Sequence, residues 1–317
     1  MTCYAPLRGY RSIHRNKNGK YPIVWPKGGQ TLEYGEGQDI ACGQCIGCRL
    51  DKSREWAIRC MHEARRFEYN SFITLTYNDA NLPDDLSLDK SHWQKFMKKL
   101  RKSMWKQAKV EGREYRRISY YHAGEYGAQF GRPHYHACLF GLDFGDKVRC
   151  GTNAQGTPLY TSTNLESIWG KGFVSIGEVN WNTAAYTARY ILKKITGEPA
   201  EEHYTWVDTE TGEVHRREPE YTTMSRAQGI GKEFYNKHAK RMYPKDGVWY
   251  KSGDKWFEMK VPKFYDSLFE IDRPDLMAKI KEERKRRSKS SLDNTPSRLE
   301  QRKTVKEAQV KMLKRTL

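Results

Sequence analysis

The chain has 317 residues, with 57 Lys and Arg against 39 Asp and Glu, and its formal net charge is +18. Hydrophobic residues make up 37% of it, and no run approaches the ~18 apolar residues of a membrane-spanning helix, so the composition excludes an integral membrane protein. The positive charge favours a polyanionic partner over a role in solubility alone, and 20 Tyr and 9 Trp offer surfaces on which unpaired bases can stack. Met1–Leu7 contains no signal-peptide core, so we expect a soluble intracellular protein.

The first fifty residues are rich in glycine and contain three closely spaced cysteines. Cys42, Cys45 and Cys48 place three thiols within seven residues, and in an intracellular chain this spacing indicates metal ligation more often than disulfides. The sequence therefore predicts a small Cys-rich module over 1–55 that binds structural Zn²⁺, with unligated thiols as the alternative. The candidates for a fourth ligand are Cys3, Cys60 and His62. We expect Cys3, which would tie down the N-terminus.

Helical and strand-like segments alternate between residues 51 and 194. We predict helices over 51–69, 91–104, 165–169 and 183–194, strands over 72–77 and 173–179, a hairpin of strands 116–125 and 134–142, and a Gly/Thr-rich loop over 145–163. This order contains no repeat of strand, helix and parallel strand. It indicates an α+β fold with a central antiparallel sheet and flanking helices.

The predicted helix 91–104 has one apolar face and one basic face. It begins at an Asp89 or Ser91 cap, and its apolar residues recur at helical spacing. The basic positions are Lys95, Lys98, Lys99, Arg101 and Lys102. We predict that they contact nucleic-acid phosphates, although a solvated charged face is the more frequent explanation of such a pattern.

Two histidines flank one residue of the second hairpin strand. Residues i and i+2 of a strand share a face, so His134 and His136 can both present a ring nitrogen to one cation. Glu125 lies across the predicted turn and can supply a third ligand, whereas the odd spacing of His122 from Glu125 places it on the opposite face. Two imidazoles and a carboxylate with open positions suit catalytic Mg²⁺ or Mn²⁺ better than structural zinc. The alternatives are hydrogen-bonded, half-buried histidines and a surface glutamate.

Two tyrosines one helical turn apart follow in the last of these helices. Tyr186 and Tyr190 share a face, and Lys193 and Lys194 come near the same face. A phenol has a pKa of ~10 and needs a nearby lysine or divalent cation to stabilise its phenolate before it becomes a good nucleophile. Core packing is the usual explanation of such a pair, so the catalytic prediction depends on its combination with the histidines.

The remainder of the chain is polar and carries no motor motif. Residues 201–280 contain short aromatic strand-like pieces, and from Lys281 onward 13 Lys and Arg stand against five Asp and Glu, which predicts a basic tail over 281–317 that is helical in parts. Gly229-Ile-Gly-Lys232 lacks the earlier glycine and the following Ser or Thr of a P-loop. The protein would therefore need a host helicase to unwind a duplex.

The histidine and tyrosine motifs together resemble those of the HUH endonucleases, in particular the rolling-circle replication initiators of small single-stranded-DNA phages, the microviruses, of the gokushovirus type. Phe72-Ile-Thr-Leu-Thr-Tyr77 resembles the first motif of that family, His134-Tyr-His136 the second and Tyr186-x-x-x-Tyr190 the third. The resemblance covers about residues 40–235. Relaxases of conjugative plasmids carry their tyrosines before the histidine pair, whereas here they follow it.

The resemblance implies an HUH endonuclease core over 56–200 and a specific reaction. With Mg²⁺ or Mn²⁺ bound, one tyrosine attacks the origin in single-stranded DNA, keeps the 5′ end as a phosphotyrosine and leaves a 3′-OH as primer. The second tyrosine then cleaves the regenerated origin, and strand joining closes a circle. The resemblance also implies a host helicase and polymerase as partners and the host bacterial cytoplasm as location.

Two other functions are compatible with parts of the pattern. A non-enzymatic, zinc-stabilised single-stranded-DNA-binding or packaging protein would explain the charge, the aromatic residues and the cysteines, but not the histidine and tyrosine pairs. A plasmid mobilisation nuclease would use the same chemistry in another process.

Overall fold

The computed structural model describes residues 3–17, 21–25, 34–127, 130–153, 156–189, 194–195, 197, 199–207, 211–252, 254–289 and 292–312. They form two compact units, one from the described parts of Met1–Lys52 and Lys279–Lys314 and the other from those of Ser53–Ala278. The division at residues 55, 200 and 280 stays a prediction. None of the described helices combines the length and the apolar sequence that crossing a membrane requires.

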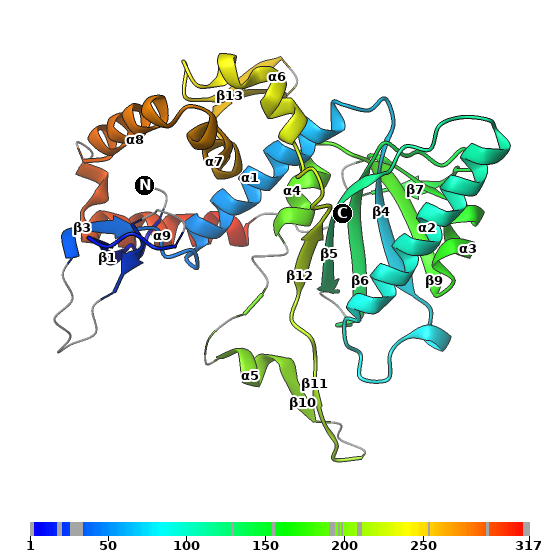
Figure 1. Ribbon diagram of the computed structural model, residues 1–317. Helices are drawn as coiled ribbons and strands as arrows, with labels where there is room; N and C mark the ends of the chain where they lie inside the picture. The colour runs from blue at the N-terminus through cyan, green and yellow to red at the C-terminus, as the bar shows by residue number, and fades with distance from the viewer. Residues whose placement is uncertain are drawn as a thin grey trace. The chain divides into compact units, whose positions relative to one another are not determined.

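A seven-stranded sheet forms the centre of the larger unit (Figure 1). Its strand order is β12-β5-β6-β4-β9-β8-β7, and the neighbouring strands pair antiparallel. The strands are β4 Asn70–Tyr77, β5 Ser119–Tyr126, β6 Pro133–Phe140, β7 Val148–Thr152, β8 Pro158–Thr161, β9 Gly172–Glu178 and β12 Tyr221–Met224. This sheet and its helices confirm the predicted α+β class and the hairpin of β5 and β6.

Helices cover both faces of the sheet. On one face α2 (Lys90–Val110) and α3 (Thr163–Trp169) pack on alternate residues of β4 and β6, as Figure 1 shows for α2. On the other face α1 (Ile46–Ala64) and α4 (Trp181–Arg189) pack on the intervening residues. Because successive side chains of a strand alternate between faces, β6 directs Tyr135 toward α2 and His136 toward α4.

The sequence of α2 explains where it begins and what it buries. The Asp89 side chain accepts a hydrogen bond from the Ser91 backbone N–H at 2.6 Å, so Asp89 is the N-cap. The buried apolar residues of the helix are Trp93, Phe96, Met97, Leu100 and Ala108. Burial of each large side chain contributes roughly 1.5–3 kcal/mol. The helix extends six residues beyond the predicted end at 104.

The predicted loop over 145–163 is wrong, because this segment contains the strands β7 and β8. All five residues of β7 are exposed, so this edge strand has no buried face and shows no alternation of apolar and polar residues. The predicted strand-like pieces near 250 form the hairpin of β13 (Val248–Ser252) and β14 (Lys255–Met259).

The remaining elements lie toward the two ends of the chain. In the smaller unit β1 (Leu7–Ser12), β2 (Ile23–Val24) and β3 (Tyr34–Ile40) form a sheet in the order β2-β1-β3. The others are α5 Pro199–Tyr204, β10 Thr205–Val207, β11 Val214–Arg216, α6 Lys232–Met242, α7 Lys263–Asp272, α8 Pro274–Lys289 and α9 Pro296–Lys311. The helices α8 and α9 confirm that the basic tail is helical in parts.

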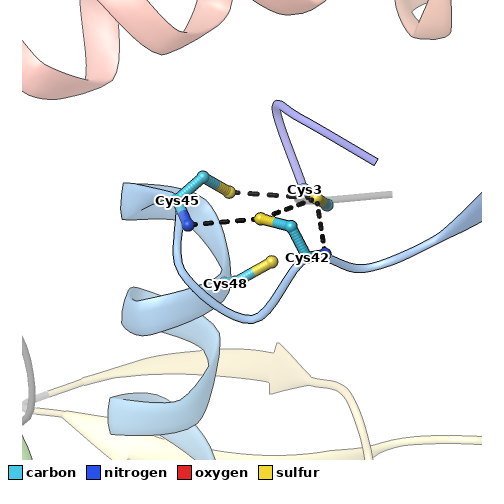
Figure 2. Close-up of side chains that lie close together, drawn as sticks. All are labelled: Cys3, Cys42, Cys45 and Cys48. Atoms are coloured by element: carbon cyan, nitrogen blue, oxygen red, sulfur yellow. Dashed lines mark hydrogen bonds between the residues drawn. The ribbon is translucent and has the colours of Figure 1, made fainter. Parts of the chain in front are cut away.

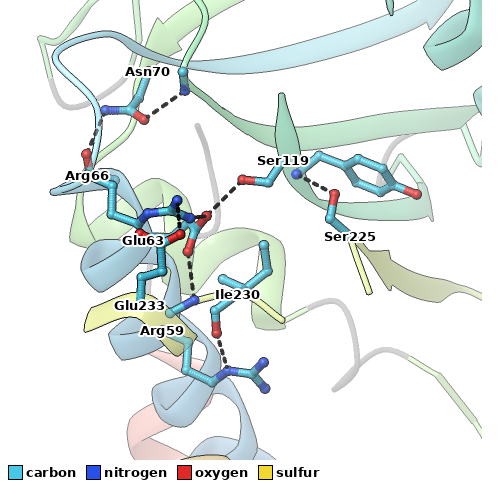
Figure 3. Close-up of polar contacts among 12 residues, drawn as sticks. Arg59, Glu63, Arg66, Asn70, Ser119, Ser225, Ile230 and Glu233 are labelled. Atoms are coloured by element: carbon cyan, nitrogen blue, oxygen red, sulfur yellow. Dashed lines mark hydrogen bonds and ion pairs between the residues drawn. The ribbon is translucent and has the colours of Figure 1, made fainter. Parts of the chain in front are cut away.

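A buried carboxylate joins α1 to β5 and to the turn before α6 (Figure 3). Glu63 is 2% exposed, and its oxygens lie 2.7 Å from Arg66 Nη1, 2.9 Å from Ser119 Oγ and 2.8 Å from the Gly231 backbone nitrogen. Gly231 has φ of 80°, and a Cβ there would lie 2.3 Å from Tyr265 Oη, so only glycine fits this turn. Its N–H binds a carboxylate of the chain itself.

Replacing Glu63 with Ala is expected to lower the free energy of unfolding by about 3 kcal/mol, because it leaves buried donors without their acceptor. Urea unfolding followed by circular dichroism measures this change. The exposed Asp84, changed to Ala as a control, should cost less than about 0.5 kcal/mol. Equal stability of the two variants would contradict a structural role for the Glu63 contacts.

Candidate active site and cysteine cluster

Three neighbouring strands bring the predicted metal ligands together on the face that α4 covers. In the β5–β6 ladder Glu125 lies directly opposite His134, and Ala123 lies opposite His136. Glu125 and His136 are 4% and 6% exposed, and Glu125 Oε1 lies 2.8 Å from His136 Nε2. The ring centroids of His134 and His136 are 6.5 Å apart. The structure therefore gathers all three residues on one patch of the sheet.

The other nitrogen of each imidazole meets a threonine of β4, which the sequence reasoning missed. Thr74 lies opposite His136 and Thr76 opposite His134, with Oγ1 to Nδ1 distances of 2.9 and 3.3 Å. In the form that binds a cation through Nε2, Nδ1–H donates to the threonine hydroxyl and fixes the ring orientation. Alternate threonines in Phe72–Tyr77 are the signal, but it becomes readable only once β4 is known to pair with β6.

Replacing Thr74 with Val is expected to weaken Mn²⁺ binding about tenfold, because Val preserves the shape of the side chain and removes the hydroxyl that orients His136. Titration calorimetry with Mn²⁺ measures the affinity, and thermal unfolding measures stability in parallel. Thr74→Ser retains the hydroxyl and should bind as the unmodified chain does. Unchanged Mn²⁺ affinity in Thr74→Val, with a lower melting temperature, would leave Thr74 only a structural role.

Glu125, His134 and His136 fit a divalent cation. In octahedral coordination with bonds of about 2.1 Å, neighbouring ligand atoms lie about 3.0 Å apart. The 2.8 Å between Glu125 Oε1 and His136 Nε2 is close to that separation. A carboxylate with imidazoles also suits Mg²⁺ and Mn²⁺ chemically.

Helix α4 places one of the two predicted nucleophiles beside this group. Thr183 and Asn180 exchange hydrogen bonds that begin the helix, at 2.9 and 3.0 Å. One turn later the half-buried Tyr186 ring stands perpendicular to His136, with centroids 5.4 Å apart. The sequence predicted these residues in one site, and the structure brings this pair together.

The other residues predicted around the tyrosines fall largely outside that description. Tyr190 and Lys193 lie outside the described residues. Lys194 is described, is half-buried and is not part of α4.

His122 lies on the opposite face of β5, as its spacing from Glu125 predicts. Its ring stacks on Trp93 with centroids 3.8 Å apart, and Nδ1 lies 3.0 Å from Thr223 Oγ1. Complete burial lowers the pKa of this histidine well below its usual range, so it is neutral at physiological pH.

The predicted basic face of α2 is only partly a free surface. Lys95, Lys98, Lys99 and Lys102 are exposed, and the first three line a hollow of about 300 Å³ with Lys171 and Trp169. Arg101 instead lies over the Tyr120 ring, and burial lowers its pKa. Since α2 covers the sheet face opposite to His136, these lysines are not part of the histidine and tyrosine site.

The four predicted cysteine ligands meet in the smaller unit (Figure 2). The sulfurs of Cys3, Cys42, Cys45 and Cys48 all lie within 4.8 Å of one another. Burial raises the pKa of Cys45, but hydrogen bonds from neighbouring backbone amides and thiols outweigh it and bring the pKa to about 7.

The other two candidates for the fourth position lie elsewhere. Cys60 is completely buried in the core beneath α1. The Nδ1 atom of His62 lies 3.0 Å from Tyr265 Oη, and its ring stacks on Phe234.

Comparison with known proteins identifies the family. A family model that describes replication-associated proteins of the ORF2 type matches residues 70–195. The chain is 31% identical over 306 residues to "Replication-associated protein ORF2" of Spiroplasma virus 4, which covers 92% of this chain and 88% of that protein. It is 30% identical to "Replication-associated protein VP4" of Bdellovibrio phage phiMH2K, over 74% of this chain and 68% of that protein. No solved structure matches the chain. The predicted relationship to phage replication proteins is confirmed, and the chain belongs to the family of phage replication-associated proteins.

Proposed function

We propose that this chain is a site-specific single-stranded-DNA endonuclease and strand ligase of the HUH type that initiates rolling-circle phage replication. The observation that carries the proposal is the contact of the Tyr186 ring with the His136 ring, whose Nε2 lies 2.8 Å from Glu125. A phenol beside a set of cation ligands is the arrangement that a tyrosine nucleophile for phosphodiesters needs.

Glu125, His134 and His136 would hold Mg²⁺ or Mn²⁺, which supplies charge stabilisation at the scissile phosphate. The Tyr186 or Tyr190 oxygen forms a bond to phosphorus, and the bond from phosphorus to the 3′ oxygen breaks. The 3′ oxygen takes up a proton and becomes the primer hydroxyl, while the 5′ phosphate stays on the tyrosine. In strand joining a 3′-OH attacks that phosphotyrosine and releases the phenol.

A basic cavity beside β5 and β12 supports binding of a single strand. It has a volume of about 910 Å³, and its cationic lining includes Arg66, Arg101, Arg116, Arg117, Arg226 and Lys237. Tyr115 and Tyr120 also line it and offer rings on which bases can stack. Two of its carboxylates, Glu63 and Glu233, are paired with Arg66, so the positive charge dominates.

The expected surroundings of the reaction follow from the same proposal. The chain would act in the host bacterial cytoplasm on the origin in single-stranded DNA. A host helicase would unwind the duplex, and a host polymerase would extend the 3′-OH.

The test is covalent attachment to DNA. The purified chain is incubated with Mn²⁺ and single-stranded oligonucleotides that tile the genome encoding it, and the products are separated under denaturing conditions. We expect one oligonucleotide to give a DNA–protein band that EDTA prevents, with the DNA attached to a tyrosine. Reversible binding without any adduct would instead favour a packaging protein. Recircularisation of the cleaved strand distinguishes an initiator from a simple nickase.

A further inference from the structure

We infer that Cys3, Cys42, Cys45 and Cys48 bind one Zn²⁺ as four thiolates and that this ion holds the smaller unit in its fold. The inference is independent of the DNA cleavage site, because it uses other residues, all in the smaller unit.

The sulfur positions match a tetrahedral metal site. With zinc–sulfur bonds of about 2.3 Å, the four sulfurs of a tetrahedron lie about 3.8 Å from one another. Cys3 Sγ lies 3.6 Å from Cys42 Sγ and 3.9 Å from Cys45 Sγ. A disulfide needs about 2.05 Å, so these thiols are gathered without being bonded to one another. Figure 2 shows the four side chains converging on one point.

Backbone amides are directed at three of the sulfurs. The N–H groups of Tyr4, Cys42 and Cys45 donate to the sulfurs of Cys45, Cys3 and Cys42, each at 3.3 Å. Such hydrogen bonds stabilise a thiolate and orient it as a ligand. Zinc binding displaces the four thiol protons, and the resulting site carries a formal charge of −2.

The topology explains how residues 39 positions apart meet. In the β1–β3 ladder Leu7 lies opposite Ile40, so the chain ends just outside that ladder bring Cys3 beside Cys42. Cys45 directly precedes α1, and Cys48 lies in its first turn. One ion would therefore join the N-terminal segment, the loop after β3 and the start of α1.

The smaller unit has little apolar core of its own. Among its described residues, the buried hydrophobic side chains are those of Cys3, Tyr4 and Leu299. Leu7, Ile13 and Trp25 are 48%, 47% and 53% exposed. Apolar burial on this scale does not offset the conformational entropy of ordering the segment, and small modules of this kind use a bound metal as their source of folding free energy.

The test measures zinc in the full-length protein by elemental analysis. We expect one zinc per chain, a decrease of at least tenfold in Cys45→Ser, and no change in Cys150→Ser, whose thiol is exposed on β7. Loading with Co²⁺ should give the absorption bands of a tetrahedral tetrathiolate. Zinc that persists in Cys45→Ser, or iron in place of zinc, would overturn the inference.

A second measurement covers the case in which Cys45→Ser does not fold. Zinc is removed from the unmodified chain with a chelator, and limited proteolysis is followed by mass spectrometry. We expect new cleavages within the described part of Met1–Lys52, an unchanged pattern in Ser53–Ala278, and recovery on adding zinc. Unchanged protection of the first segment would refute a structural zinc, whatever the result of the DNA adduct assay.

Discussion

Replacing both Tyr186 and Tyr190 with Phe is expected to abolish covalent attachment of the chain to single-stranded DNA, with a decrease of at least about 10³-fold in adduct yield. Phenylalanine preserves the ring that packs beside His136 and Phe72 but removes the oxygen that attacks phosphorus. The fold should therefore remain intact. The measurement is the amount of radiolabelled oligonucleotide that stays on the protein in a denaturing gel.

The single variants divide the roles of the two tyrosines. If Tyr186→Phe alone prevents the first cleavage, Tyr186 is the initial nucleophile, and if Tyr190→Phe does so, the order is reversed. Tyr69→Phe is a matched control, because Tyr69 is 56% exposed and lies outside the site. An adduct of normal yield in the double variant would exclude this tyrosine pair as the nucleophile.

Replacing His136 with Ala is expected to lower the rate of DNA cleavage by about 10³-fold, which corresponds to about 4 kcal/mol of transition-state stabilisation. His136 contacts Glu125 through Nε2, Thr74 through Nδ1 and Tyr186 through its ring. Its removal affects ligation, orientation and packing together. The measurement is single-turnover cleavage at several Mn²⁺ concentrations.

The exposed His203 on α5, changed to Ala, is the control and should cleave at the normal rate. Thermal unfolding of both variants shows whether the sheet is retained. Cleavage by a folded His136→Ala chain at the normal rate, with unchanged dependence on Mn²⁺, would remove His136 from the proposed site.

Local periodicity explains how much of the candidate site could be predicted. A period of two places His134 and His136 on one face and His122 on the other, and a short turn places Glu125 opposite His134. These relations hold within one hairpin, so sequence spacing is sufficient to find them. The same reasoning fails at β7, where no residue is buried and the pattern carries no information.

Relations between distant segments could not be derived from spacing. The contact of Thr74 with His136 depends on β6 lying between β5 and β4, and strand order is a property of the whole sheet. The distance between Tyr186 and His136 depends on how α4 packs on the sheet. The amphipathic pattern of α2 predicts a basic face but does not reveal that it covers the sheet opposite the histidines.

The direct pairing of Glu125 with His134 restricts where this chain can change in length during evolution. Residues gained or lost in the turn between Tyr126 and Pro133 leave the ladder intact, so phage lineages can vary this turn without moving the ligands. One residue gained within β5 before Glu125 would send its carboxylate to the Trp93 side of the sheet, away from both histidines. Length variation among relatives is therefore compatible with the site in the turn and incompatible with it in the adjoining strands.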